Sequence, residues 1–250
     1  MRYPAARAMT AQLDLFLGSA VGLAYAATVP PERVGRVYVA DDDTAAEVRA
    51  LGHDVHVFAG EVAEPARLCL SVHFPRVLPA RLLALYEGAY NIHPGRLPHG
   101  KGMFPLFWAL WAGEPAGVTL HVMSAELDGG AILQQVPVET GETETMESLR
   151  ERLAAVERGI LADATPKLLA GERLEDHYEP LDQRALGDGG SLHTRRDFVR
   201  MREQPPLDTM TAHDLVRLAR ALHLSGYPGV AITADGRPAR LQLVFDPIEP

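Results

Sequence analysis

The sequence contains few residues that would cross-link the chain or anchor it in a membrane. Among its 250 residues there is one cysteine, Cys69, so an internal disulfide is excluded and a reducing cytoplasm is the predicted compartment. No uninterrupted apolar run approaches the roughly 18 residues of a membrane span. The start of the chain, 1–4, lacks the order of a secretory signal. We therefore expect no membrane partner.

Positive charge is also scarce. The chain has 24 Lys and Arg against 33 Asp and Glu, which gives a net charge of -9. Lys101 and Lys167 are its only lysines. A protein that binds a nucleic-acid backbone needs a basic face, so we expect no nucleic-acid partner. The hydrophobic fraction of 47% is ample for the core of one medium-sized domain, with or without a small appendage.

A dinucleotide-binding Gly-x-Gly-x-x-Gly fingerprint is missing too, and Gly18 and Gly22 indicate instead close packing of a helix on a strand. Strand-length apolar segments alternate with helical ones. The predicted strands are 13–17, 35–40, 53–59, 68–72, 88–92, 118–123 and 131–138. The predicted helices are 20–29, 45–51 (capped by Thr44), 79–86, one starting around Pro105, and a long one opened by Thr143 and Thr145 that stops before Pro166. This alternation predicts an α/β fold with a doubly wound, mostly parallel sheet.

The C-terminal quarter has a different pattern. Residues 182–191 are rich in Gly and Asp and are predicted to be a linker. After it, Thr211 is placed to cap a helix, and apolar runs flank a turn at Asp235-Gly236, which is typical of a hairpin. We predict a main domain over 1–181 and a small appendage of helix plus β-hairpin over 192–250.

The most informative polar residues follow the strand at 88–92. Asn91 and His93 are two positions apart, so on an extended backbone both side chains leave the same face. Ligands of doubly wound sheets bind outside the carboxyl ends of the strands, where these two residues lie. A second strand, 117–123, runs into a loop that ends in Asp128-Gly129-Gly130. An amide, an imidazole and a carboxylate are thus candidates for one site.

These two stretches resemble the 10-formyltetrahydrofolate-dependent formyltransferases, above all their sugar N-formyltransferases. The resemblance covers roughly Cys69–Leu153 well, and three catalytic positions match in order. The matching residues are Asn91-Ile92-His93-Pro94-Gly95, Leu97-Pro98, Gly117-Val118-Thr119 and Asp128-Gly129-Gly130. It implies a formyltransferase fold and 10-formyltetrahydrofolate as formyl donor, without a metal.

The resemblance also implies roles for the three catalytic positions. His93 would be the general base and would stabilise the tetrahedral intermediate. Asn91 would donate a hydrogen bond to the oxyanion, and Asp128 would orient the imidazole and relay protons. Taken singly, each residue has a simpler explanation as a loop or turn residue. His73, His93, His99 and His121 lack the tight spacing of a metal site.

Two segments are expected to hold the folate. The segment 71–78 resembles the part of the family that lines the pterin slot, and the loop 123–128 would form its other side. The residues predicted to bind the donor are Phe74, Pro75, Arg76, Val77, Leu78, Met123, Ala125 and Leu127. For Leu78 and Val72, ordinary core packing is an equally good interpretation.

The acceptor amine is less constrained. The chain is acidic and its appendage is short, which disfavours tRNA, and the appendage resembles that of the sugar enzymes. We expect a nucleotide-linked amino sugar, contacted by Arg96, Lys101 and Met103, although a surface charge is the simpler interpretation of the first two. Met103 departs from the family, where an aromatic residue is common, so a hydroxyornithine, an aminoglycoside or a peptide natural product stays open.

Two other functions compete with transfer. A hydrolase of the same fold would release formate to water, and a non-catalytic folate-binding protein would be expected to lack one of the three catalytic residues, none of which is missing. The apolar helix and hairpin of the appendage predict a homodimer formed through this region.

Overall fold

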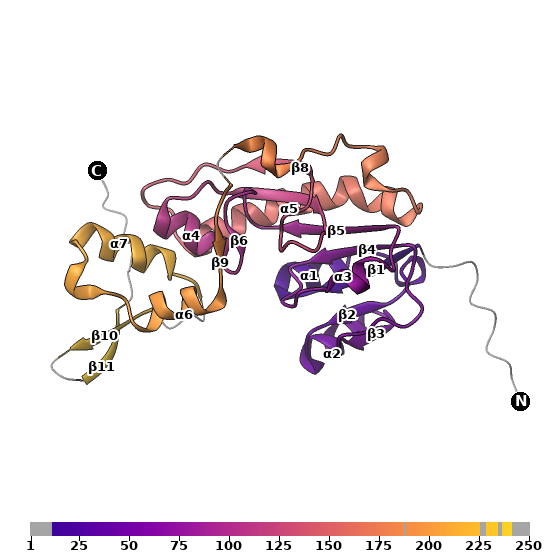
Figure 1. The fold of residues 1–250 in the computed structure, drawn as a ribbon. Coiled ribbons are helices and arrows are strands. Elements are labelled where there is room, and N and C mark those ends of the chain that lie inside the picture. Colours follow the sequence, from indigo (N-terminus) through magenta and orange to yellow (C-terminus); the bar gives the residue numbers. More distant parts are fainter. Residues whose placement is uncertain (1–11, 188, 226–228, 235–236, 242–250) are drawn as a thin grey trace, which may run out of the picture. The chain divides into compact units, whose positions relative to one another are not determined.

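The computed structural model describes residues 12–187, 189–225, 229–234 and 237–241. Its largest element is a seven-stranded sheet with the order β3-β2-β1-β4-β5-β7-β8 (Figure 1). The strands are β1 (Leu13–Leu17), β2 (Val37–Val39), β3 (Val55–Val57), β4 (Leu68–Val72), β5 (Gly88–His93), β7 (Gly117–Val122) and β8 (Ile132–Pro137). The pairs from β3 to β5 are parallel, and β7 runs antiparallel to β5. This confirms the predicted doubly wound, mostly parallel sheet.

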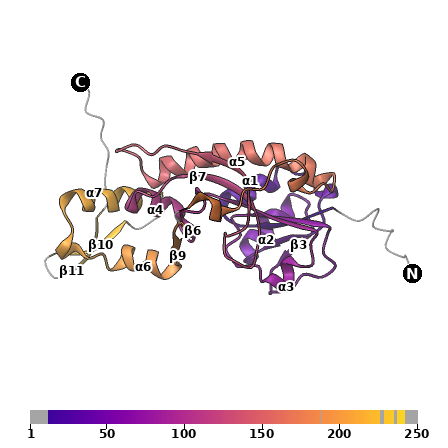
Figure 2. The same cartoon turned by 45° about the horizontal axis from the view of Figure 1, so that its top comes forward.

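The helices follow the strands in the predicted alternation. They are α1 (Ser19–Ala26), α2 (Asp42–Ala50), α3 (Ala80–Leu83), α4 (Pro105–Ala112), α5 (Met146–Leu169), α6 (Arg195–Glu203) and α7 (Ala212–Ala221). Figure 2 shows α2 beside β3. Strands β1 and β4 are buried along their whole length, as expected for parallel strands covered on both faces.

An aromatic cluster lies in this core. The ring of Phe16 stacks on Tyr38 at 4.9 Å between centroids and meets the edge of Phe58 at 5.8 Å. Such pairs add roughly 0.5–1.5 kcal/mol each beyond their buried area. Beside the cluster lies the carboxylate of Asp14, which accepts the hydroxyl of Tyr86. The cluster fixes β1, which precedes α1, against β2 and the residue after β3.

The predicted start of α2 and the predicted end of α5 were wrong. Helix α2 begins at Asp42, and its N-cap is Asp41, whose carboxylate accepts the N–H of Thr44 at 2.8 Å. A carboxylate is as good a cap as a hydroxyl, so the earlier residue takes that position. Helix α5 does not stop before Pro166 but continues to Leu169.

The chain divides into two compact units. The first unit consists of Met1–His93, Thr119–Gln135 and Val156–Gly187, and the second of Pro94–Val118, Val136–Ala155 and Asp188–Pro250. The division into 1–181 and 192–250 stays a prediction. In the predicted linker, a short 3-10 helix (Gln183–Leu186) carries a side chain, Gln183, that is 4% exposed.

The second unit contains the appendage. Thr211 caps α7 as predicted: its hydroxyl accepts the N–H of Asp214, and the carboxylate of Asp214 accepts the N–H of Thr211 in return. The hairpin strands β10 (Val230–Ala234) and β11 (Arg237–Leu241) pair antiparallel, while the predicted turn at 235–236 lies outside the described residues. The sequence pattern did not predict α6, whose Phe198 stacks on Phe104 at 3.8 Å, or the pairing of β6 (Lys101–Gly102) with β9 (Leu192–His193). Two-residue strands have no periodicity to detect.

Candidate active site

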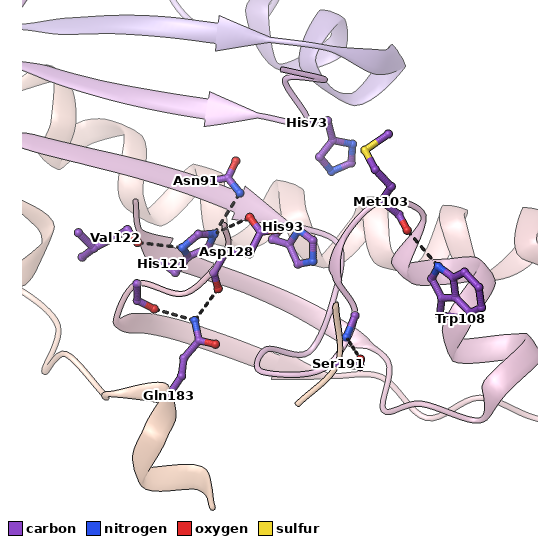
Figure 3. A network of polar contacts seen from close by, with 12 residues as sticks. His73, Asn91, His93, Met103, Trp108, His121, Val122, Asp128, Gln183 and Ser191 are labelled. Carbon is purple, nitrogen blue, oxygen red and sulfur yellow. Dashed lines mark hydrogen bonds and ion pairs between the residues drawn. The ribbon is translucent and has the colours of Figure 1, made fainter. Parts of the chain in front are cut away.

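The antiparallel pairing of β5 and β7 builds the core of the candidate site. Asn91 lies directly opposite His121, and His93 lies opposite Thr119. Asn91 and His93 share one face of β5 because they are two positions apart. The amide nitrogen of Asn91 is 3.0 Å from Nε2 of His121 (Figure 3). The sheet thus brings an amide and two imidazoles to the same place.

The hydrogen bonds of His121 determine which way the Asn91 amide faces. Nδ1 of His121 lies 2.9 Å from the carbonyl oxygen of Val122, which only accepts, so Nδ1 carries the proton. In the neutral ring Nε2 is then an acceptor, and Nδ2 of Asn91 donates to it. The same Nδ2 has a second N–H, which is available to a further acceptor such as a substrate oxygen.

Asp128 lies between the two imidazoles. Its Oδ2 is 3.7 Å from Nδ1 of His93 and its Oδ1 is 3.7 Å from Nε2 of His121. These separations suit ion pairing rather than direct hydrogen bonding. His93 and His121 are 5% and 1% exposed. A carboxylate in this position stabilises positive charge on either ring, in a place with little water to screen it.

A side chain from a distant segment of the chain, Gln183, holds the loop that carries Asp128. Asp128 has a φ of 50°, in the left-handed region, where a non-glycine residue is strained. The side-chain nitrogen of Gln183 donates to the carbonyl oxygens of Asp128 and Gly130, each at 2.7 Å (Figure 3). A Cβ on Gly130 would lie 1.8 Å from the carbonyl oxygen of Val122, so only glycine fits there. Gln183 therefore keeps a strained loop in place.

The structure thus brings Asn91, His93 and Asp128 together, and their roles stay predictions. It adds two residues that the sequence prediction did not include. His121 was considered only as a weak metal candidate, although its place opposite Asn91 follows once β5 and β7 are paired antiparallel. No motif or periodicity marks Gln183, since it contacts the loop across more than 50 residues of sequence.

The residues predicted to bind the donor also lie in the first unit. Phe74 and Met123 are half-buried against the aromatic cluster, and Leu78 is buried within it. The guanidinium of Arg76 donates to the carbonyl oxygens of Phe58 and Ala40, each at 2.6 Å. This fastens the loop to the ends of β2 and β3.

The exposed members of that set are apolar except for Arg76. Val77 is 67% exposed and Leu127 is 41% exposed. Pro75 and Ala125 are exposed as well. The two loops thus offer apolar surface to solvent, of the kind a flat ring would cover.

The residues predicted to contact the acceptor belong to the second unit. Arg96 is exposed, whereas Lys101 is 9% exposed. The carbonyl oxygen of Met103 accepts the indole N–H of Trp108 at 3.1 Å (Figure 3). In the parts of the chain that the structure describes, no three His, Cys, Asp or Glu side chains are grouped as metal ligands, and no helix is long and apolar enough to cross a membrane.

A protein-family comparison gives a direct match. The model of the formyl transferase family matches residues 29–165, which is more than half of the chain. The match includes the strands that carry Asn91, His93 and His121, and the loop with Asp128.

Individual relatives are similar to this chain and are formyltransferases as well. The chain is 37% identical over 171 residues to a methionyl-tRNA formyltransferase of Geobacillus thermodenitrificans, covering 68% of this chain and 50% of that protein. It is 27% identical over 200 residues to a dTDP-4-amino-4,6-dideoxyglucose formyltransferase of Mycobacterium bovis, covering 79% and 81%. The fold is similar to that of a sugar N-formyltransferase from Shewanella sp., with a TM-score of 0.78 and 23% identity, covering 95% and 98% of the two chains. The chain thus spans only half the length of the first of these relatives.

Proposed function

Because the chain belongs to the formyl transferase family, we propose that it is an N-formyltransferase that uses 10-formyltetrahydrofolate and acts on the amine of a nucleotide-linked sugar. The observation that carries the proposal is the cluster of Asn91, His93, His121 and Asp128 on the paired strands β5 and β7 and the loop after β7. The donor supplies an activated formyl carbon. The chain must hold it, accept a proton from the amine and stabilise the negative charge that develops on the formyl oxygen.

The residues divide these tasks. His93 takes the proton of the attacking amine, and Asp128 stabilises the imidazolium that results. Asn91 directs its second N–H at the formyl oxygen, because the first is committed to His121. A single donor of this kind typically lowers the barrier by about 2.7–4 kcal/mol. His93 then returns the proton to the leaving nitrogen of the folate.

Apolar surface supports the folate as donor. Val77 and Leu127 are exposed on the two loops predicted to flank the pterin, and burying them under a ring removes apolar area from water. Phe74 and Leu78 would contribute indirectly, because they pack the loop against the aromatic cluster. Arg76, tied to two carbonyl oxygens, would keep the loop in place.

Coverage of the relatives favours an amino sugar as acceptor. The chain spans 81% of the sugar formyltransferase of Mycobacterium bovis but 50% of the methionyl-tRNA formyltransferase. Arg96 and Lys101 would pair with the phosphates, and Met103 would contact the sugar or base. A hydroxyornithine, an aminoglycoside or a peptide amine would be recognised without the phosphate contacts.

The test is an assay with 10-formyltetrahydrofolate and a panel of amines, including nucleotide-linked 3-amino and 4-amino sugars. We expect free tetrahydrofolate and a product heavier by one CO group, only when the right amine is present. Consumption of the donor without any amine would identify a formyltetrahydrofolate hydrolase instead. Binding of the donor with no consumption by any amine would favour a non-catalytic folate-binding protein.

Two properties of the whole protein are also proposals. We propose a cytoplasmic enzyme, which is supported by its single, buried cysteine. We also propose a homodimer formed through the appendage, where Val216 of α7 is 44% exposed and Val199 of α6 is 37% exposed. A monomeric mass by light scattering would contradict the dimer.

A further inference from the structure

The segment that follows α5 returns to the sheet beside the loop that carries Asp128. Leu181 exchanges two backbone hydrogen bonds with Ile132, at 2.8 and 2.9 Å, so the segment pairs antiparallel with the first residue of β8. Two residues further on, Gln183 begins a short 3-10 helix that is capped by the carboxylate of Asp182. The pairing and the cap together fix the backbone from which the side chain of Gln183 reaches the loop.

The side-chain amide of Gln183 can face the loop in one orientation only. It lies 2.7 Å from each of two carbonyl oxygens, those of Asp128 and Gly130 (Figure 3). Carbonyl oxygens only accept, so the nitrogen end of the amide faces them and gives one N–H to each. The other end, Oε1, is buried and has no hydrogen-bond partner among the residues that the structure describes. Burying such an oxygen costs stability, so the value of Gln183 lies in its two donors.

The backbone of the loop is strained at Asp128 itself. Its φ is 50°, and a non-glycine residue keeps such a conformation only where the surroundings maintain it. Inside the loop, the N–H of Gly129 donates to the carbonyl oxygen of Glu126 at 3.1 Å. The two bonds from Gln183 come from outside the loop and fix the carbonyl oxygens before and after Gly129. They therefore oppose relaxation of Asp128 toward an unstrained backbone.

The position of the Asp128 carboxylate determines its contact with both imidazoles. One oxygen is 3.7 Å from Nδ1 of His93, and the other is 3.7 Å from Nε2 of His121. The side chain of Asp128 is 11% exposed, so water screens these interactions little. Because each oxygen contacts a different ring, a small change of the backbone at Asp128 weakens one contact or both. A residue that fixes this backbone therefore acts on His93 through the carboxylate.

We propose that Gln183 is a positioning residue for formyl transfer, which holds the carboxylate of Asp128 within reach of His93. The inference rests on the function proposed above. Gln183 is 4% exposed and both of its N–H donors are used by the loop, so it acts through Asp128 and not on a substrate. When His93 takes the amine proton, Asp128 stabilises the imidazolium only if the loop is in place. Loss of the two donors should therefore lower kcat and leave the KM of the amine nearly unchanged.

The first measurement does not depend on turnover. Gln183→Met keeps the length of the side chain and removes both donors. Hydrogen–deuterium exchange, followed by mass spectrometry on the full chain, should show that the backbone amides of 123–130 exchange roughly 10-fold faster in the variant than in the wild type. Thermal melting checks that the variant is folded. Unchanged exchange in a folded variant would overturn the proposal, because Gln183 would then not hold the loop.

Kinetics then separate positioning from general support of the fold. In the amine-dependent assay, Gln183→Met should lower kcat on the order of 10²-fold, a typical cost of a slightly displaced group. Asp128→Ala combined with Gln183→Met should be no slower than Asp128→Ala alone, because Gln183 acts through that carboxylate. If the two losses in kcat multiply instead, the proposal is overturned, since a residue that only supports the fold slows the enzyme with or without Asp128.

A second glutamine of the first unit provides the matched control. Gln134 of β8 also donates through Nε2, to the carboxylate of Asp163 on α5 at 3.0 Å. Gln134→Met makes the same chemical change and should leave both the exchange of 123–130 and kcat at their wild-type values. Equal effects of the two substitutions would overturn the proposal. If the wild type formylates no amine, the proposed function fails, whereas the exchange measurement still decides whether Gln183 holds the loop.

Discussion

At the scale of single residues, the orientation of Asn91 is decided by a partner on another strand. The oxygen and nitrogen ends of the side-chain amide have nearly the same size, so shape alone does not decide which end faces the site. His121, with its proton on Nδ1, accepts from the nitrogen end and so turns that end toward the site. His121 is therefore a positioning residue in the proposed reaction.

We expect His121→Ala to lower kcat for formyl transfer roughly 10²-fold, since a misplaced donor costs about that much. Asn91→Ala should lower kcat by about 10²–10³-fold. The double variant should be little slower than Asn91→Ala, because His121 acts through that amide. Steady-state kinetics of the wild type and the three variants complete a double-mutant cycle. If the two losses in kcat multiply in the double variant, His121 acts independently of Asn91.

His93 is expected to be indispensable for the chemistry rather than for donor binding. His93→Ala removes the base that accepts the amine proton, so transfer should fall below detection, while the affinity for 10-formyltetrahydrofolate stays near that of the wild type. Calorimetric titration with the donor and the amine-dependent assay measure the two quantities. Turnover close to the wild-type rate would refute the assignment.

Only part of this site could be predicted from the sequence. The i, i+2 spacing of Asn91 and His93 and the Asp128-Gly129-Gly130 end of the loop are local patterns. The contact of His121 with Asn91 depends on which strand pairs with β5, and in which direction. The hydrogen bond from Gln183 to the loop depends on where the distant segment that carries Gln183 packs against the sheet. Neither leaves a local trace.

At the scale of elements, the length of α5 shows packing prevailing over local preference. Pro166 removes one helical N–H, and proline inside a helix costs about 3 kcal/mol. Yet Ala164 and Leu168, on either side of it, are fully buried. The hydroxyl of Thr165 donates to the carbonyl oxygen of Leu161 at 2.6 Å. The buried face continues past the proline, so the helix continues too.

Asp14 joins three segments at the start of β1, and its replacement should test that junction. Its carboxylate accepts N–H groups of Arg36 and Ala66 and the hydroxyl of Tyr86, at 2.8 to 3.0 Å. Asp14→Asn puts an NH2 group in place of one acceptor oxygen, so a buried donor loses its partner. We expect the free energy of unfolding to fall by about 1–3 kcal/mol. Urea denaturation with an unchanged m value measures it.

The same carboxylate gives a pH dependence of known sign. Burial raises the pKa of Asp14 above its ordinary value of 3.8, although its hydrogen bonds oppose this. Between 3.8 and the raised pKa the folded protein holds more protons than the unfolded chain. The contribution of Asp14 to the free energy of unfolding should therefore fall as pH rises through that window, so the free energy of the wild type minus that of Asp14→Asn should decrease. A parallel pH profile of the two proteins would contradict this.

At the scale of the whole molecule, the sheet could be predicted and the division into units could not. Alternating strand and helix patterns fix the sheet because each pattern is local. The units interleave: residues 94–118 and 136–155 group with the C-terminal part, away from their sequence neighbours. A boundary that the chain crosses several times leaves no change of composition at any one point.

The single cysteine reports on the unfolding of the first unit. Cys69 lies in β4, is fully buried, and burial raises the pKa of its thiol well above the ordinary value. The thiolate is the reactive form, so a thiol reagent such as dithionitrobenzoate should react only after the sheet opens. We expect the reaction to be slow in native buffer, to quicken with urea in parallel with the loss of structure, and to reach one thiol per chain in guanidinium chloride. Rapid, complete reaction in native buffer would show that β4 opens locally and would contradict its place at the centre of a stable sheet.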